Sequence, residues 1–305
     1  MKRYPDRKFR HYNASDFYIF TNPASAEYNP KKIDYLAAEL KKFGKPYQII
    51  EMTSPDSIIR LKGAIQRHPI AIIACGGDST VNLVAQNLIR RTTILGIYPL
   101  GKFNNIYRSL YGDPDTKKAV RHILSGDTIK IDHGLAGGRF FTGSIGIGLM
   151  VELAEQMAIK RIPRFGIGWS RIASQAAASV PAKQLSIKID AFRFDMTPRL
   201  LNINLLPYTT GLPIAPACIN DDGKGEVIFD IGQDKAILSS FIRMIYKKKY
   251  IYSDEIRMFR GRKISIAPLA KCKIYLDGEI FEHPSESLDI EFFEKKIRVF
   301  AKSKD

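Results

Sequence analysis

The chain has 305 residues, enough for about two domains that each bury a hydrophobic core, which excludes a one-layer module or a peptide-like scaffold. Lys and Arg number 47 against 31 Asp and Glu, so the formal net charge is +16. With 45% apolar and 26% charged residues, the composition is that of a globular protein and not of a disordered one. The positive charge predicts an anionic partner: a phosphate-bearing small molecule, a phospholipid headgroup or nucleic acid.

The first part of the chain alternates β-rich runs with helical periodicity, which is typical of a parallel sheet between two layers of helices. The expected strands are residues 17–20, 47–52, 70–74 and 94–100, and the expected helices follow them near residues 36–43, 54–56, 81–89, 106–111 and 116–124. The run at 70–74 is continuously apolar, as in a strand buried on both faces. We therefore expect a doubly wound, three-layer α/β domain over residues 1–128, to which residues 295–305 return.

Strand-rich runs dominate after residue 128 and predict a largely antiparallel β-sandwich domain over residues 129–294. The expected strands are residues 128–132, 140–147, 184–194, 199–206 and 226–231, with several short ones from 263 to the end, and helical stretches are expected at 149–179 and 235–246. Gly126 and Asp127 favour a turn and mark the joint between the two domains.

The cysteines and the N-terminal sequence indicate the cellular compartment of the protein. Cys75, Cys218 and Cys272 are far apart and odd in number, which fits neither a disulfide framework nor a zinc cage. The charged N-terminus has no apolar segment behind it, and no uncharged apolar stretch reaches the roughly 18 residues that a membrane span needs. We expect a cytoplasmic protein without a signal peptide or a membrane span.

A glycine turn, Gly76-Gly77-Asp78-Ser79-Thr80, joins the buried strand to the next helix. The backbone N–H groups and the positive helix end at such a turn hold phosphates. Asp78 would repel a phosphate unless a divalent metal lies between them, so the turn is a candidate metal–nucleotide site. The alternative is that Asp78, Ser79 and Thr80 only cap the helix, and position alone favours the two interpretations about equally.

Two further polar loops, Asn22–Ser25 and Pro99–Asn105, also follow predicted strands. The carboxyl ends of parallel strands meet at one edge of a sheet, so the three loops should lie together. The alternative is that Asn, Pro and Ser are simply turn residues.

An ordered set of motifs extends over most of the chain. They are Asn22-Pro23-Ala24-Ser25, Gly76-Gly77-Asp78-Ser79-Thr80 with Asn82, Pro99-Leu100-Gly101-Lys102-Phe103-Asn104-Asn105, Ile131-Asp132-His133-Gly134, the Gly-rich run Gly143–Gly148, Asp221-Asp222-Gly223 and Asp277-Gly278-Glu279. In order and spacing this set resembles the diacylglycerol kinase catalytic-domain family of lipid kinases, which includes sphingosine, ceramide and bacterial lipid kinases. Gly-Gly-Asp alone would also fit NAD kinases or phosphofructokinases, whose nucleotide fold is similar.

The resemblance implies an ATP- and Mg²⁺-dependent lipid kinase that transfers the γ-phosphoryl group to the hydroxyl of a diacylglycerol-like lipid, with ATP between the two domains. It implies nucleotide binding by Asn22, Ser25, Gly76, Gly77, Asp78, Ser79, Thr80, Gly101, Lys102, Asn104 and Asn105. By the same resemblance, Asp277 is the catalytic base for the lipid hydroxyl, and Glu279 and Asp78 interact with magnesium or its waters. The alternative for Asp277-Gly278 is a two-residue hairpin turn.

The chain departs from the family pattern in its phosphate loops. Ala26 and Ser79 stand where the family has Gly, which permits positive φ and close backbone approach to phosphate. Lys102 replaces a Thr, and Asn105 replaces an acidic residue found in some members. Lys102 either binds phosphate, fills the nucleotide cleft together with Phe103, or is a solvated loop lysine. The alternative function is therefore an impaired kinase-fold protein that binds nucleotide or lipid without transferring phosphate.

Two basic segments bear on the membrane. Residues 160–169 mix cations with apolar side chains and hold the single Trp, a composition found at bilayer interfaces, although a packed helix explains it as well. Residues 243–263 contain eight basic and two acidic residues, which suit either an anionic headgroup or a solvated face. We expect a lipid substrate, peripheral contact with an anionic membrane and no nucleic-acid partner; a homodimer is left open.

Overall fold

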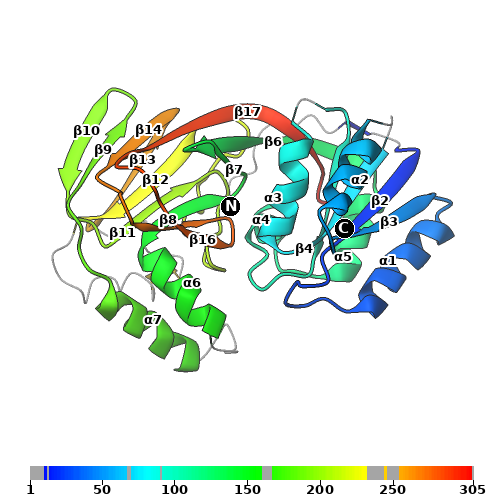
Figure 1. Cartoon of the computed structure of the whole chain (residues 1–305), viewed down its shortest axis with the longest axis horizontal. Helices are drawn as coiled ribbons and strands as arrows, with labels where there is room; N and C mark the ends of the chain where they lie inside the picture. Colours follow the sequence, from blue (N-terminus) through cyan, green and yellow to red (C-terminus); the bar gives the residue numbers. More distant parts are fainter. Residues whose placement is uncertain are drawn as a thin grey trace. The chain divides into compact units, whose positions relative to one another are not determined.

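The computed structural model describes residues 10–11, 14–66, 70–89, 91–159, 167–231, 244–245 and 254–303 (Figure 1). The chain divides into two compact units: unit 1 comprises Met1–Asp132 and Lys295–Asp305, and unit 2 comprises His133–Glu294. Strands β6 (Asp127–Ala136) and β17 (Leu288–Phe300) run through these division points, so each of the two strands belongs partly to both units.

Unit 1 has the predicted parallel sheet, with strands in the order β17, β5, β4, β2, β3. Its remaining strands are β1 (Arg10–His11), β2 (Asp16–Thr21), β3 (Tyr47–Glu51), β4 (Ile70–Gly76) and β5 (Ile94–Pro99). Its helices are α1 (Pro30–Lys42), α2 (Asp56–Ile65), α3 (Asp78–Asn87), α4 (Asn105–Tyr111) and α5 (Thr116–Leu124). Helix α1 packs beside α5, and α3 packs beside α2 and α4. Every residue of β4 is buried, as its apolar run predicts.

Unit 2 consists of two antiparallel sheets. One has the order β13, β12, β11, β8, β15, β16, and the other contains β10, β9, β14 and the first part of β17. The elements are β7 (Arg139–Phe141), β8 (Ser144–Gly148), α6 (Leu149–Ile159), α7 (Ile167–Ser179), β9 (Leu185–Ile189), β10 (Phe192–Met196), β11 (Leu200–Asn204), β12 (Gly225–Asp230), β13 (Ile256–Gly261), β14 (Lys263–Ala267), β15 (Lys273–Leu276) and β16 (Glu279–Glu282). Ile147 and Phe229 from one sheet share a core with Ile187 and Ile266 from the other, which makes unit 2 the predicted β-sandwich.

The structure corrects several predicted elements. Residues 140–147 and 184–194 are each two strands and not one, because turns at 142–143 and 190–191 interrupt them. Strand β13 was not predicted, and α3 begins at Asp78, three residues before the predicted start. The basic segment at 160–169 and the helical stretch at 235–246 fall largely outside the described residues.

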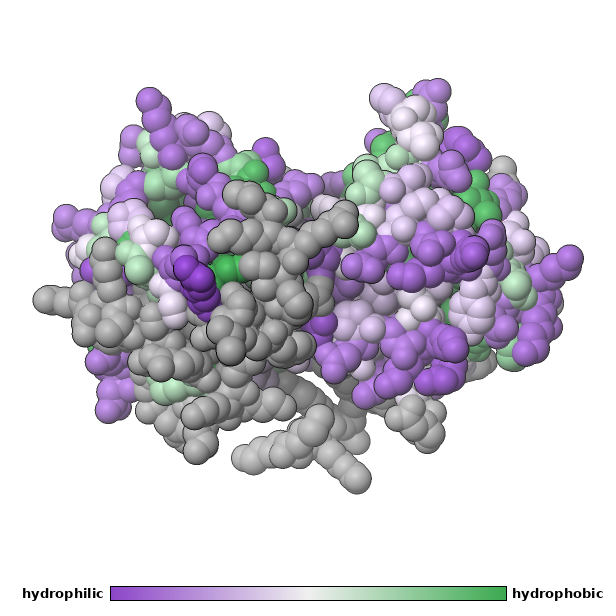
Figure 2. All heavy atoms as spheres, turned by 90° about the horizontal axis from the view of Figure 1, so that it is seen from below, coloured by the Kyte–Doolittle hydropathy of each residue, from purple (hydrophilic) through white to green (hydrophobic). Residues whose placement is uncertain are grey.

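The surface shows how hydrophilic and hydrophobic side chains are distributed. On the face drawn in Figure 2, hydrophilic side chains predominate on unit 1, and hydrophobic ones form small separate patches. No helix within the described residues is both long and apolar enough to cross a membrane.

Candidate functional site

Three loops of unit 1 meet at the carboxyl ends of β2, β4 and β5. Asn22 Nδ2 donates a hydrogen bond to Thr80 Oγ1 over 3.0 Å, which joins the first loop to the glycine turn. The backbone N–H of Glu27 donates to the carbonyl of Leu100 over 2.9 Å, which joins the first loop to the third. The three loops therefore form one polar cluster, although Asn22 and Leu100 are 78 positions apart in the sequence. This is expected for loops that follow neighbouring strands of a parallel sheet.

The glycines of this cluster are required for close packing. A Cβ on Gly101 would lie 2.2 Å from the Cα of Gly77, and a Cβ on Gly76 would lie 2.4 Å from Thr80 Oγ1. None of these three glycines has a positive φ. The absence of a side chain, and not a left-handed backbone, is what the two loops need from glycine here.

Asp78 joins the glycine turn to the third loop. Its Oδ1 accepts the backbone N–H of Ile106 over 2.9 Å, and its Oδ2 accepts both the backbone N–H and the side-chain Nδ2 of Asn105 over 3.0 Å. The side chain is buried, with 5% of its residue surface exposed. Asp78 is the first residue of α3, yet its carboxylate binds the first turn of α4. The role proposed for it as a cap of its own helix is therefore replaced by a link between two helices.

Asn104 fixes the shape of the third loop. It has a left-handed backbone, φ 51° and ψ 47°, which Asn tolerates better than most residues. Its side-chain oxygen accepts the N–H of Gly101 over 2.8 Å, and its side-chain nitrogen donates to the carbonyl of the same residue over 2.7 Å. Asn104 and Asn105 thus both bind parts of the protein itself.

The departures from the family pattern carry no backbone strain. Ser79 lies in the first turn of α3, and neither Ser79 nor Ala26 has a positive φ. Ser25 donates its backbone N–H to the carbonyl of Asn22 over 3.0 Å and closes the first loop. Lys102 is partly exposed, and its Nζ lies 5.9 Å from the centre of the Phe103 ring. A side chain larger than Gly is therefore compatible with the backbone at positions 26 and 79.

Asp277 lies in unit 2, at the tip of the β15–β16 hairpin. With Gly278 it forms a two-residue turn, in which φ is 42° for Asp277 and 95° for Gly278. Its Oδ2 accepts the backbone N–H groups of Thr142 and Gly143, at 2.8 and 2.9 Å, and its Oδ1 accepts that of Ser144 at 2.6 Å. Only 2% of the residue surface is exposed. The two-residue hairpin turn is therefore present, and the aspartate in it is also buried and hydrogen-bonded to the backbone.

The β9–β10 hairpin provides an internal comparison for Asp277. Asp190 is likewise the first residue of a two-residue turn, with φ 51°. Its carboxylate accepts the backbone N–H groups of Arg262 and Lys263 over 3.0 and 2.9 Å, but it is exposed. The carboxylates of both turn aspartates, Asp190 and Asp277, therefore accept backbone N–H groups. Asp277 differs from Asp190 in being buried.

The residues predicted to interact with magnesium do not form a ready-made cage. Glu279 is exposed at the start of β16 in unit 2, and Asp78 is buried in unit 1. Within the described residues, no three His, Cys, Asp or Glu side chains are grouped so that they could hold a metal ion.

Sequence reasoning missed two features of unit 2. The backbone of residues 142–144 binds Asp277, and a Cβ on Gly143 would lie 2.4 Å from Asp277 Oδ1; the Gly-rich run that begins there was the available signal. Glu226 is buried next to Arg260, with Oε1 2.7 Å from Nε, and burial raises the pKa of Glu226 to about 7 despite that cation. Nothing in the sequence around Glu226 indicates that pKa.

Comparison with known proteins shows which proteins this chain is similar to. Residues 16–136 match the model of the diacylglycerol kinase catalytic domain. A diacylglycerol kinase of Bacillus subtilis strain 168 is 27% identical over 274 residues, which cover 86% of this chain and 88% of that protein. A diacylglycerol kinase of Staphylococcus carnosus strain TM300 is 22% identical over 228 residues, 73% of this chain and 74% of that protein.

Solved structures with the same fold extend beyond this family. A crystal structure of a diacylglycerol kinase from Bacillus anthracis strain Sterne covers 97% of this chain and 98% of its own, with a TM-score of 0.69 and 16% identity. An NAD kinase from Archaeoglobus fulgidus in complex with ATP covers 94% of each chain, with a TM-score of 0.51 and 10% identity. These likenesses agree with the α/β and antiparallel β architecture of the two units.

Proposed function

We propose that this protein is a lipid kinase that transfers the γ-phosphoryl group of ATP to the hydroxyl of a diacylglycerol-like lipid. The observation that carries the proposal is the packing of the glycine turn, Gly76–Thr80, against the loop Gly101–Asn105 in a domain of the diacylglycerol kinase family. This packing positions the N-terminal turn of α3 by contacts from two sides. Phosphoryl transfer depends mainly on such positioning and on neutralising charge.

Nucleotide phosphates would bind at the glycine turn. Helix α3 has ten residues, so its N-terminal N–H groups and its dipole favour an anion beside Gly77 and Ser79. Asn22, Ser25 and Thr80 would contribute polar groups from the same edge of the sheet, and Lys102 would add a cation. Gly76, Gly101, Asn104 and Asn105 would act indirectly, because they hold the two loops together.

Magnesium fits this donor set only as a partner of the nucleotide. Mg²⁺ commonly keeps several waters and binds one or two carboxylates together with substrate phosphates. Asp78 offers one carboxylate, both of whose oxygens accept N–H groups of the third loop. We therefore assign Asp78 to magnesium through its water molecules, and Glu279 keeps only the role that the family resemblance implies. The ion would neutralise phosphate charge, and Asp78 would keep the loop in place.

Asp277 is the proposed group for the lipid hydroxyl. Three backbone N–H donors fix the direction of its oxygens. A carboxylate held in this way can orient a hydroxyl by accepting its hydrogen bond, and a strong base is not needed for phosphoryl transfer.

A transfer assay tests this function. The protein is incubated with labelled Mg-ATP and vesicles that contain diacylglycerol, monoacylglycerol or ceramide as the acceptor, and extractable labelled lipid is measured. Product from one of these lipids supports the proposal, whereas its absence from all of them contradicts it. Vesicle sedimentation with anionic and zwitterionic lipids measures the peripheral membrane association that we propose for a cytoplasmic form of the protein.

A second candidate function is binding of nucleotide without transfer. It is favoured by Lys102, which stands where the family has Thr and whose Nζ lies 5.9 Å from the centre of the Phe103 ring in the third loop. Calorimetric titration with Mg-ATP separates the two candidates: heat of binding without labelled lipid product selects the second. No heat at millimolar nucleotide contradicts both.

A further inference from the structure

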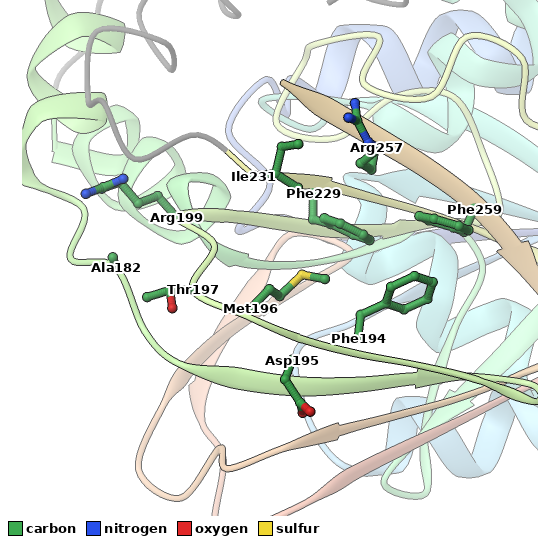
Figure 3. Close-up of a pocket in the computed structure, with 10 residues that line it drawn as sticks. All are labelled: Ala182, Phe194, Asp195, Met196, Thr197, Arg199, Phe229, Ile231, Arg257 and Phe259. Carbon is green, nitrogen blue, oxygen red and sulfur yellow. The ribbon is translucent and has the colours of Figure 1, made fainter. Parts of the chain in front are cut away.

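Unit 2 contains a cavity of about 890 Å³ beside strands β10, β12 and β13 (Figure 3). Phe194, Met196, Phe229 and Phe259 line it from within, and Thr197 and Arg257 are further lining residues. This volume lies in the range of sites that enclose a small molecule. No residue to which we assign nucleotide or hydroxyl binding lines the cavity.

The inner wall of the cavity is aromatic. The rings of Phe194 and Phe259 are 4.6 Å apart between centroids, and those of Phe229 and Phe259 are 5.6 Å apart. Figure 3 shows Met196 on the same side, close to Phe194. Phe229 is buried in the sandwich core, while Phe194 and Phe259 are only partly buried and retain accessible ring surface. An apolar chain placed against this wall would remove that surface from water.

One side of the cavity carries a positive charge. Arg257 is exposed and donates hydrogen bonds to the backbone carbonyls of Asp254 and Ile256, and within the described residues it forms no ion pair with a carboxylate. The acidic residue of the described lining is Asp195, which forms an ion pair with Arg193 at 3.5 Å. Figure 3 shows the Asp195 carboxylate directed away from the rings. The cavity therefore combines an apolar wall with two lining arginines, Arg199 and Arg257, of which Arg257 is the exposed one.

We propose that this cavity binds a single-chain anionic amphiphile, with the acyl chain against Phe194 and Phe259 and the carboxylate or phosphate head on the guanidinium of Arg257. Arginine suits either head because its N–H groups pair with two oxygens of a carboxylate or phosphate. A neutral glycerolipid offers no anionic group to this guanidinium. The proposal goes beyond phosphoryl transfer, because the binding requires neither nucleotide nor turnover.

The test measures displacement of a fluorescent anthroyloxy-palmitate from the full-length protein without nucleotide. Palmitate and 1-palmitoyl-lysophosphatidate are the competitors, both below the concentration at which they aggregate, and 1-palmitoylglycerol is the neutral comparison. Arg257→Gln should weaken binding of the anions by about 10-fold or more, the scale of a hydrogen bond to a charged group. Thr197→Trp fills the cavity from an exposed position and should abolish binding.

Arg262→Gln is the matched control, because Arg262 is an exposed arginine just after β13 that does not line the cavity and whose side chain donates to the backbone carbonyl of Asp222. It should bind as the wild type does. Stronger competition by palmitate assigns the site to a carboxylate head, and stronger competition by lysophosphatidate assigns it to a phosphate head. Three results overturn the proposal: no binding of the probe, an equal loss in Arg262→Gln, or equal competition by 1-palmitoylglycerol.

Discussion

Replacing Asp277 by Asn separates its structural role from its proposed catalytic one. In Asp277→Asn one carboxylate oxygen becomes an NH₂ donor. If the amide oxygen takes the place of Oδ2, Thr142 and Gly143 keep an acceptor, but the N–H of Ser144, which is 2.6 Å from Oδ1, faces another donor. The opposite orientation deprives two N–H groups of their acceptor, so the first is the less costly.

The structural cost follows from these contacts. A hydrogen bond to a charged group contributes about 1.5–3 kcal/mol, and a neutral one about 0.5–1.5 kcal/mol. One lost bond in a buried position and two that lose their charge give a destabilisation of roughly 3–5 kcal/mol. For a domain of this size the midpoint of thermal unfolding should fall by roughly 10 °C. The isosteric variant is therefore not neutral for folding.

Thermal unfolding followed by circular dichroism checks this value, and lipid phosphorylation is measured at a temperature where the variant is fully folded. Asp190→Asn is the control, because its carboxylate also binds backbone N–H groups but is exposed, so water replaces a lost partner and the midpoint should change much less. An Asp277→Asn midpoint equal to that of the wild type refutes the hydrogen-bond reasoning. Full activity of the folded variant removes Asp277 from the reaction.

Three further predictions concern the loops and Glu226. Gly101→Ala should lower the free energy of unfolding by about 1–3 kcal/mol and abolish Mg-ATP binding in calorimetry, because its Cβ would lie 2.2 Å from Gly77 Cα. Gly63→Ala in α2 is the control: its Cβ would have no atom within 4 Å, so this variant should stabilise the protein by about 0.5–1 kcal/mol. Asn105→Asp should lower the unfolding midpoint, because a second carboxylate would replace the donor to Asp78; an unchanged midpoint would argue against that contact. The pKa of Glu226 is raised to about 7 in the folded protein, so the stability that its protonated form contributes should be present below pH 4.5 and lost as the pH rises to about 7. Glu226→Gln should remove this part of the pH dependence of the unfolding midpoint, and an identical profile in both proteins would contradict it.

Local signals in the sequence were sufficient for the α/β unit. The apolar run of β4 and the helical spacing of Leu36 and Leu40, both buried, depend on periodicity within one segment. The turn at Asp190 was missed because its second residue is Ala191 and not Gly, so the usual hairpin signal is absent. It is held by N–H groups of Arg262 and Lys263, more than 70 positions away, which no local pattern reveals.

In the candidate site too, local sequence patterns do not reveal contacts between distant residues. Gly76, Gly77 and Gly101 were identified as loop glycines, but the reason for them, direct packing of two backbones, exists only in three dimensions. Asp78 was interpreted as a phosphate-site carboxylate or a cap of its own helix, and its bonds to Asn105 and Ile106 connect it to another helix. A carboxylate in a turn has several backbone donors within reach, and only the fold selects among them.

The buried aspartates also affect how this protein responds to salt. Asp78, Asp132, Asp230 and Asp277 are each at most 5% exposed, and each accepts backbone N–H groups. Lysines and arginines at the surface therefore have fewer carboxylates near them than the 31 acidic residues of the chain suggest. Their attraction to an anionic surface should weaken steeply as the Debye length shortens from about 10 Å at 0.1 M salt to about 3 Å at 1 M. The loops that the buried aspartates hold should keep their shape over the same range of ionic strength.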